Sequence, residues 1–179
     1  MKKGIAASKG YAIGTVFIQE HEEIIISDAK VSDIAAEKEK LSKALAQSKE
    51  QLEAIKEKTA NEIGEHEAQV FEAHLMLLDD VEFTGQMEMT IENDQLNAMK
   101  AVQNVTDTFV MIFDSMDDPY MRERAADIKD VSKRIIANLA GKGGNGMENV
   151  GANTVVVAHD LTPSDTAHRH NRHRGKNCV

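Results

Sequence analysis

The sequence predicts a mainly α-helical protein, in which an antiparallel helical bundle is inserted into an incomplete small α/β domain. Apolar residues recur at three- and four-residue spacing between residues 32 and 140, a pattern typical of amphipathic helices. Only 4% of residues are aromatic and Trp is absent, which disfavours a β-sandwich. Strand-like alternation is confined to residues 4–26 and 154–158, so the helical segment separates two pieces of one α/β unit.

Residues 1–31 are expected to supply the first strands of that unit. Ala12, Gly14, Val16 and Ile18 alternate with other side chains, and residues 24–26 form a short apolar run. Alternation with a period of two places side chains on opposite faces of a strand. We therefore expect two or three short strands before the first helix.

The helical domain, residues 32–140, opens with one long helix that ends near Asn61. Ser32 is a suitable N-cap, and Leu41, Leu45 and Leu52 belong to a seam that repeats every three, four or seven residues, with Glu and Lys on the solvated faces. The seam is compatible with a coiled-coil dimer. We favour an antiparallel pair within one bundle, because further helical patterns follow at once.

Further helices follow the break at Gly64. One helix spans residues 65–78, and a shorter helix restarts at Asp79-Asp80 and ends at a turn around residues 93–94. An apolar stripe then extends from Leu96 to Met116, and a last helix begins at Asp118-Pro119, an N-cap followed by proline at the first helical position. Gly141 is expected to end this helix.

Residues 141–153 are predicted to form a linker. Its GKGGNG stretch invites comparison with a phosphate-binding loop, but it follows a helix and lacks the required spacing before a terminal GK[ST]. Residues 154–167 then supply a buried strand and a helix start, capped by Thr162 with Pro163 inside the helix. Residues 168–179 form a basic tail without a structural pattern.

Four consecutive apolar residues, Leu75 to Leu78, do not fit one core-facing stripe. Successive side chains diverge by about 100° around a helix, so the run spreads over most of its circumference. The helix is either buried on two sides or exposes an apolar patch. Because acidic residues surround the run, an exposed patch suits a basic partner. These residues are Glu65, Glu67, Glu72, Asp79, Asp80 and Glu82.

Charge and composition exclude several partner classes. The net charge is −9, and the last twelve residues carry four Arg or Lys and no acid, which leaves −13 on residues 1–167. Such a body repels nucleic acid and anionic membranes. The sequence contains no apolar stretch of membrane-spanning length and no secretory signal pattern. With Cys178 as the single cysteine, we expect a cytoplasmic protein without internal disulfides.

Four strings carry a family resemblance that covers about residues 1–167. The chain resembles the N-terminal part of Enzyme I, the phosphoenolpyruvate-protein phosphotransferase of the bacterial sugar phosphotransferase system. In that family a helical domain, inserted in a phosphohistidine domain, binds the phosphocarrier protein HPr. The strings are GIAASKGYAIG at 4–14, GEHEAQVFEAHLMLLDD at 64–80, DDPYMRERAADIKDVSKR at 117–134 and VVVAHDLTPSDTA at 155–167.

The resemblance implies which residues lie at or near an HPr-docking surface, and it favours exposure of the apolar run. For His74, the sequence pattern alone favours a structural core position, and the resemblance adds a docking role as the alternative. His66 departs from an all-acidic rim. The implied docking residues are Glu65, His74, Met76, Leu77, Asp80, Glu82, Phe83, Tyr120, Met121 and Arg124.

The family's GGRTSH-type motif, whose histidine takes the phosphoryl group, does not occur in this sequence. The family's C-terminal barrel, which binds Mg²⁺ and phosphoenolpyruvate, has no counterpart either. We therefore expect no cofactor, no catalytic residue and no autophosphorylation in this chain alone, which reads as truncated before the motif. A frameshift or altered sequence would explain residues 168–179. The resemblance also implies a monomer, since the family dimerises through its C-terminal region.

The histidines near the C-terminal end allow a functional and a simpler interpretation. His168, His170, His173 and Cys178 could bind a metal, but their spacing matches no standard zinc site and the neighbouring arginines oppose a cation. His159 follows a strand and could be mistaken for a phosphoryl acceptor. A structural role for His159 is favoured, because the resemblance places the acceptor in the missing motif.

Overall fold

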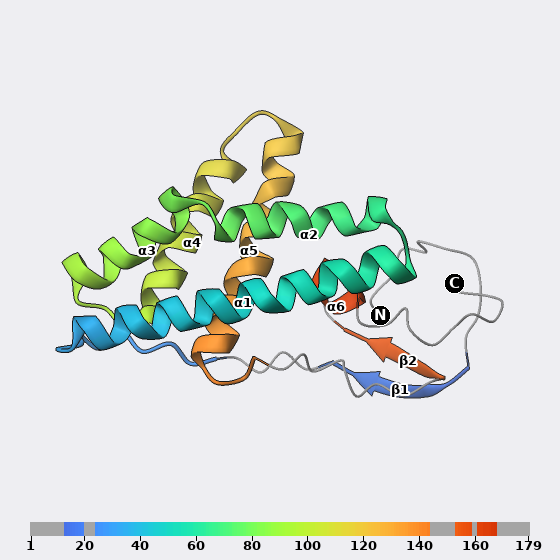
Figure 1. Cartoon of the computed structure of the whole chain (residues 1–179), viewed down its shortest axis with the longest axis horizontal. Coiled ribbons are helices and arrows are strands. Elements are labelled where there is room, and N and C mark those ends of the chain that lie inside the picture. The colour runs from blue at the N-terminus through green and yellow to red at the C-terminus, as the bar shows by residue number, and fades with distance from the viewer. Residues whose placement is uncertain (1–12, 20–23, 144–152, 159–160, 168–179) are drawn as a thin grey trace, which may run out of the picture. The chain divides into compact units, whose positions relative to one another are not determined.

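The computed structural model describes residues 13–19, 24–143, 153–158 and 161–167. The chain divides into two compact units, one formed by Glu23–Gly144 and the other by Met1–Glu22 together with Asn145–Val179. The first unit is helical and the second contains the strands (Figure 1). This architecture confirms the predicted fold class.

Helices α1 (Ile34–Glu62) and α2 (Glu65–Leu78) lie side by side as an antiparallel pair (Figure 1). The N-cap of α1 is Asp33, one residue later than predicted, because its carboxylate accepts the N–H of Ala36 at 2.9 Å. The buried positions of α1 follow the predicted seam and include Leu41 and Leu52. Since that seam is buried within the unit, it is not available for the alternative coiled-coil dimer.

Helix α3 (Val81–Asp94) begins at Asp80, whose carboxylate accepts the N–H groups of Glu82 and Phe83 at 2.8 and 3.3 Å. The helix continues through the turn expected at residues 93–94 and ends at Gln95, which adopts a left-handed conformation with φ 51°.

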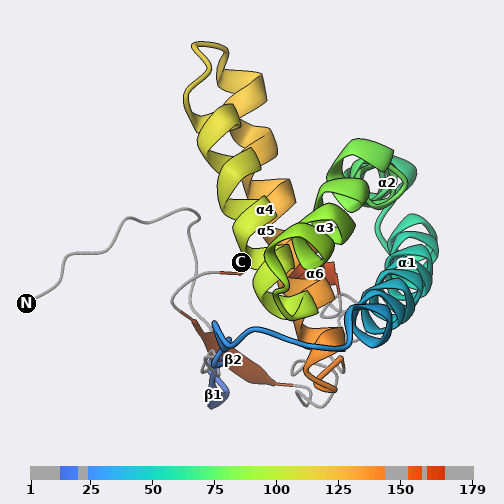
Figure 2. The same cartoon turned by 90° about the vertical axis from the view of Figure 1, so that its left-hand side faces the viewer.

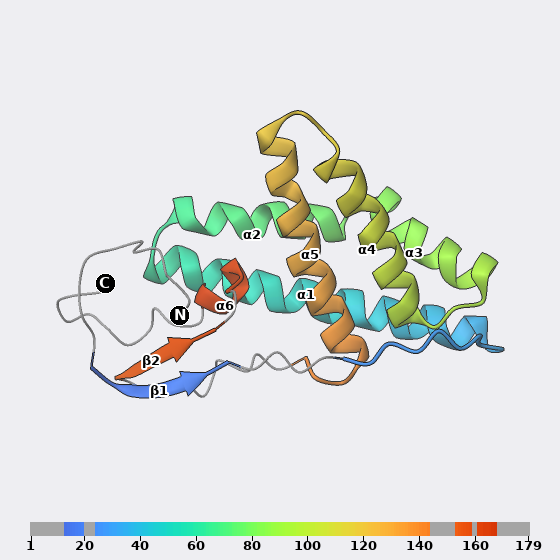
Figure 3. The ribbon, with the colours of Figure 1, turned by 180° about the vertical axis from the view of Figure 1, so that it is seen from behind.

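Helices α4 (Ala98–Asp114) and α5 (Pro119–Leu139) form a hairpin that crosses the α1–α2 pair (Figures 1 and 3). Its turn projects beyond the other helices (Figure 2). Asp118 caps α5 with proline at its first turn, as predicted, and Gly141 follows the helix with φ 69°. Glu37 ties the start of α4 to α1, because its Oε2 accepts the N–H of Ala98 at 2.9 Å.

In the second unit, β1 (Thr15–Ile18) pairs in parallel with β2 (Thr154–Val157), from Thr15 opposite Thr154 to Ile18 opposite Val157. The short helix α6 (Pro163–Ala167) follows β2. The whole helical unit thus lies between two paired strands in the sequence. Residues 24–26 form no strand, contrary to expectation, because no neighbouring strand pairs with them in the described part of the chain.

Candidate functional site

The apolar run of α2 is divided between core and solvent. Met76 is 68% exposed, Leu75 and Leu77 are half-buried, and Leu78 is buried. Because consecutive side chains diverge by about 100°, one side of the run packs inward while another faces water. The structure therefore combines the two alternatives that the sequence left open.

The corner between α2 and α3 extends this exposed apolar region. Val81, the first residue of α3, is 82% exposed, and its neighbours Asp80 and Glu82 are exposed as well. Val81 was not among the residues expected at this surface. Its exposure could have been expected from the sequence, because Val81 does not belong to the four-residue repeat that begins at Phe83 and forms the buried face of α3.

Phe83 itself is fully buried, which corrects the surface position expected for it. It starts a stripe with Met87 and Ile91, spaced four residues apart on one face of α3. That face packs toward α4, where the Phe83 ring meets Phe109. Phe83 therefore cannot touch a partner directly and instead holds the corner in place.

His74 is also buried, with 1% of its surface exposed, so its expected surface position is corrected too. Its Nε2 donates to Asp127 Oδ1 of α5 at 3.2 Å, and its Nδ1 lies 3.8 Å from Asp130 Oδ2. The ring also packs at right angles to Phe71, with centroids 5.9 Å apart. The structure thus selects the core alternative for this histidine.

The projecting end of the α4–α5 hairpin carries the remaining expected residues. Tyr120 and Met121 are exposed and Arg124 is half-buried. Arg124 Nη2 donates to Tyr120 Oη at 3.1 Å, and the guanidinium lies 5.4 Å from the centre of the Tyr120 ring. These two side chains therefore stabilise each other on one face of α5.

Three further apolar side chains, Met111, Ile112 and Met116, are exposed at this end of the hairpin. The apolar stripe expected between Leu96 and Met116 includes Ile112 and Met116 but not Met111. The sequence held a signal for this exposure. Residues 109–113 are all apolar, and, like residues 75–78, they cannot all lie on one buried face of a helix. We call the exposed apolar residues of both regions, together with the half-buried Leu77, the apolar surface: Met76, Leu77, Val81, Met111, Ile112, Met116, Tyr120 and Met121.

Buried contacts connect the two halves of the apolar surface. Phe83 meets Phe109, which lies two residues before Met111, and His74 meets Asp127, three residues after Arg124. The α2–α3 corner therefore lies at the base of the projecting end of the hairpin (Figure 2).

Acidic groups flank the apolar surface, although lysines of α1 neutralise some of them. Asp79 pairs with Lys49 at 2.7 Å, and Glu72 lies 3.6 Å from Lys56. Glu65 is exposed at the start of α2, about three helical turns from Met76, so it lies away from the corner. Besides the paired Asp79, the exposed acids within two residues of the apolar residues include Asp80, Glu82, Asp114, Asp117 and Asp118.

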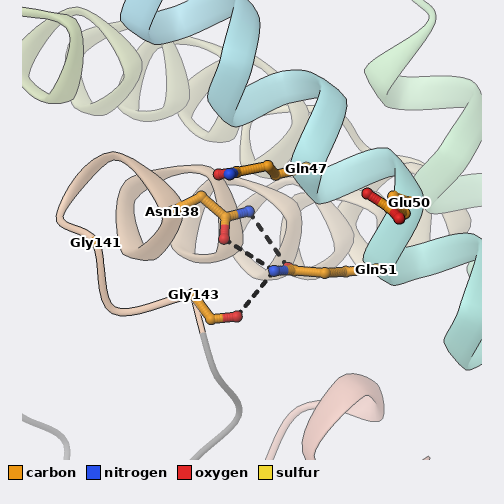
Figure 4. A pocket seen from close by; sticks show the side chains of 6 residues that line it. All are labelled: Gln47, Glu50, Gln51, Asn138, Gly141 and Gly143. Atoms are coloured by element: carbon orange, nitrogen blue, oxygen red, sulfur yellow. Dashed lines mark hydrogen bonds between the residues drawn. The ribbon is translucent and has the colours of Figure 1, made fainter.

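A polar pocket of about 400 Å³ lies between α1 and the segment after α5 (Figure 4). Gln51 Nε2 donates to Asn138 Oδ1 at 2.9 Å and to the carbonyl of Gly143 at 2.8 Å, while Gln51 Oε1 accepts from Arg134 Nη1 at 2.9 Å. A backbone carbonyl, not an N–H, of Gly143 faces Gln51. This part of the GKGGNG stretch therefore fastens the end of α5 to α1.

Within the described ranges, no helix has the length and apolarity needed to cross a membrane. The same residues contain no group of three or more His, Cys, Asp or Glu side chains placed to hold a metal ion. The histidines and cysteine weighed as a metal site in the tail, and His159, lie outside the described residues.

The chain belongs to the family described as PEP-utilising enzyme, N-terminal, which residues 3–124 match. It is 47% identical over 168 residues to the phosphoenolpyruvate-protein phosphotransferase of Enterococcus faecalis, covering 93% of this chain and 29% of that protein. The relative of the same description from Listeria monocytogenes is 46% identical over 165 residues, covering 92% of this chain and 29% of that protein. The chain thus spans less than a third of the length of these relatives and corresponds to their N-terminal part.

Solved structures agree with this assignment. A solution structure described as Enzyme I (nEIt) matches with a TM-score of 0.81 and 40% identity, over 94% of this chain and 68% of that chain. A structure described as the N-terminal domain of Enzyme 1 - Nitrogen matches with a TM-score of 0.69 over 88% of this chain and 64% of that chain, at 21% identity. The second likeness concerns the fold alone.

Proposed function

We propose that this chain is the carrier-recognition part of a phosphoenolpyruvate-protein phosphotransferase, and that its apolar surface docks the phosphocarrier protein HPr. The observation that carries the proposal is the exposure of Met76, Val81 and Tyr120 on one end of a well-packed helical unit. Several large apolar side chains exposed on the α2–α3 corner and on the end of the adjoining hairpin are typical of an interaction surface. The relatives' name supplies the phosphoryl-transfer context.

The composition of the surface suits a transient complex with a basic partner. Its centre is apolar, while Asp80, Glu82 and Asp117 are exposed around it. Small interfaces of this kind release quickly, and complementary charge accelerates association more than it tightens binding. A carrier that must dock, exchange a phosphoryl group and leave requires these properties.

The contact residues in this proposal differ from the expected set in three positions, Glu65, His74 and Phe83. His74 and Phe83 support the surface from below, whereas Met76, Leu77, Tyr120, Met121 and Arg124 remain contact residues together with Asp80 and Glu82. Glu65 contributes only long-range charge, since it lies about three turns from the corner. A relay of this type operates in the cytoplasm, and we place the protein there.

A titration of the ¹⁵N-labelled chain with HPr tests the proposal. We expect fast-exchange shifts for residues around Met76, Val81 and Tyr120, and their loss in Met76→Glu. Met89→Glu is the matched control, because Met89 is another exposed methionine, on α3 two turns beyond Val81. Shifts that avoid the apolar surface, or equal loss of binding in both variants, would refute the proposal.

A further inference from the structure

The buried His74 contributes nothing to the apolar surface, yet it lies where the two helix pairs of the unit meet. Helix α2 packs along α1, helix α5 packs along α4, and α5 crosses the α1–α2 pair (Figures 1 and 3). At the crossing, His74 Nε2 donates to Asp127 Oδ1 at 3.2 Å. A carboxylate oxygen can only accept, so the direction of this hydrogen bond is determined.

A second polar contact fixes α5 to the α1–α2 pair from the same face. Arg134 Nη1 donates to Gln51 Oε1 of α1 at 2.9 Å, and Arg134 follows Asp127 by seven residues, about two turns of helix. Positions seven residues apart share one face of a helix. The two contacts therefore restrain both the position of α5 along its axis and its rotation about that axis.

The same face of α5 continues upward to the docking residues. Arg124 and Tyr120 precede Asp127 by three and seven residues, and they bond to each other. On α2, Leu77 follows His74 by three residues, so it also occupies the next turn on the same side. On both helices, the residues of the His74–Asp127 hydrogen bond are thus one helical turn from a docking residue, Leu77 on α2 and Arg124 on α5.

We propose that His74 is a positioning residue for carrier docking, which holds α5 so that Tyr120 and Arg124 form one continuous surface with Met76 and Leu77 of α2. This inference rests on the proposed function and names the buried residue that pre-forms its site. A pre-formed surface avoids the free energy that ordering it during binding would cost.

The chemistry of the His74 site supports a role beyond filling space. Its Nδ1 is buried without a hydrogen-bond partner among the described residues, and it lies 3.8 Å from Asp130 Oδ2. A buried polar atom left unpaired is destabilising, whereas an apolar side chain of similar size would avoid that cost. A histidine that lowers stability at this position is consistent with a function that requires a fixed arrangement of α2 and α5.

The other charged groups near the crossing are engaged elsewhere. On α1, Lys49 and Lys56 face Asp79 and Glu72 of α2, and on α5 Arg134 bonds to Gln51. Between α2 and α5, His74 makes the ionic contacts, to Asp127 at 3.2 Å and to Asp130 at 3.8 Å. Substitution of His74 or Asp127 should disturb the crossing while leaving the α1–α2 pair intact.

The test compares His74→Leu and His74→Gln with the unchanged chain at one fixed pH, at a temperature where all three are folded. We expect His74→Leu to raise the HPr dissociation constant about fivefold, the equivalent of one ordinary hydrogen bond. His74→Gln, whose amide can donate to Asp127, should restore affinity to within about twofold. Residual dipolar couplings should show a changed angle between α2 and α5 in His74→Leu only.

A spectroscopic signature identifies the bond itself. In the unchanged chain, imidazole ¹⁵N spectra should show a proton on Nε2 of His74, and Asp127→Ala should shift that signal and change the helix angle as His74→Leu does. Asp127→Ala also serves if His74→Leu does not fold, because the Asp127 side chain is partly exposed.

The outcomes separate this inference from the proposed function. If the unchanged chain does not bind HPr, the proposed function fails, and the couplings alone then decide whether His74 sets the helix angle. If it binds, but folded His74→Leu or Asp127→Ala binds equally well with an unchanged angle, the positioning role is overturned.

Discussion

The ring of Phe83 on α3 meets the ring of Phe109 on α4 edge to face, with centroids 5.2 Å apart and planes at 77°. This geometry is favourable for aromatic pairs and adds to the gain from burying both rings. The contact anchors the first turn of α3, and with it the exposed corner that Val81 occupies. Phe83 and Met76 therefore affect partner binding by different routes, which mutation can separate.

Phe83→Ala should lower the free energy of unfolding by about 3–5 kcal/mol, because it opens a cavity at a fully buried position. Met76→Ala should change it by less than about 0.5 kcal/mol, since Met76 is largely exposed. Urea unfolding followed by circular dichroism measures both. Equal stability losses in the two variants would contradict the burial that separates them.

Binding of HPr should weaken as salt concentration rises. The Debye length falls from about 10 Å at 0.1 M to about 3 Å at 1 M ionic strength, so attraction by the exposed acids is screened. The double variant Glu82→Gln with Asp117→Asn should flatten this dependence. Glu39→Gln is the control, because Glu39 is an exposed acid on α1 that already pairs with Lys43 at 2.7 Å. Calorimetric titration at several salt concentrations measures the slopes, and a double variant as steep as the control would count against steering by these acids.

Acid should destabilise the helical unit partly through Glu37. Burial alone would raise the pKa of Glu37, but hydrogen bonds from Lys40 and from the N–H of Ala98 outweigh it and hold that pKa below its ordinary value. A carboxylate with a lowered folded-state pKa contributes stability above its unfolded pKa of about 4.3, and this contribution is lost as pH falls through the folded pKa.

Glu37→Gln should therefore lower the free energy of unfolding at pH 7. Between pH 5 and the acid transition, the free energy of unfolding should fall less in this variant than in the unchanged chain. The variant keeps an acceptor for the N–H of Ala98 but has no charge to titrate. Urea midpoints across that pH range give the comparison. Parallel curves for the two proteins would show that another group dominates acid unfolding.

This 179-residue chain should not phosphorylate itself when mixed with phosphoenolpyruvate and Mg²⁺. Its sequence contains no GGRTSH string, and a phosphohistidine requires a nucleophilic ring nitrogen held beside donors for the phosphoryl oxygens. Intact mass spectrometry at neutral to basic pH is the measurement, with a full-length relative as positive control. A mass increase of about 80 Da, the mass of one added phosphoryl group, would disprove this expectation.

Much of the fold was predictable because local patterns dominate it. The cap at Asp118, the proline after it and the stop at Gly141 act through neighbouring backbone groups, so they can be read directly from the sequence. The short run at residues 24–26 was misjudged because a strand exists only if another strand pairs with it. The parallel pairing of β1 with β2 was not predicted in register, since it joins segments separated by the whole helical unit.

For the candidate site, the sequence could group the residues but could not give the direction of each side chain. Sequence reasoning could place Met76, His74 and Phe83 within one short segment, and composition marked the acids around them. It could not decide which of the three faces water, because periodicity gives the spacing of side chains around a helix but not which face the rest of the protein covers. The neighbours that cover a side chain lie far along the chain, as Asp127 does for His74.

The sequence by itself determined where helices begin and end and which stripes are apolar, because capping and helical periodicity act over a few residues. Only the tertiary structure decided that His74 and Phe83 face inward while Met76 and Val81 face water. That choice depends on α4 and α5 crossing the other helices, and burial is a property of packed neighbours rather than of a residue's own chemistry.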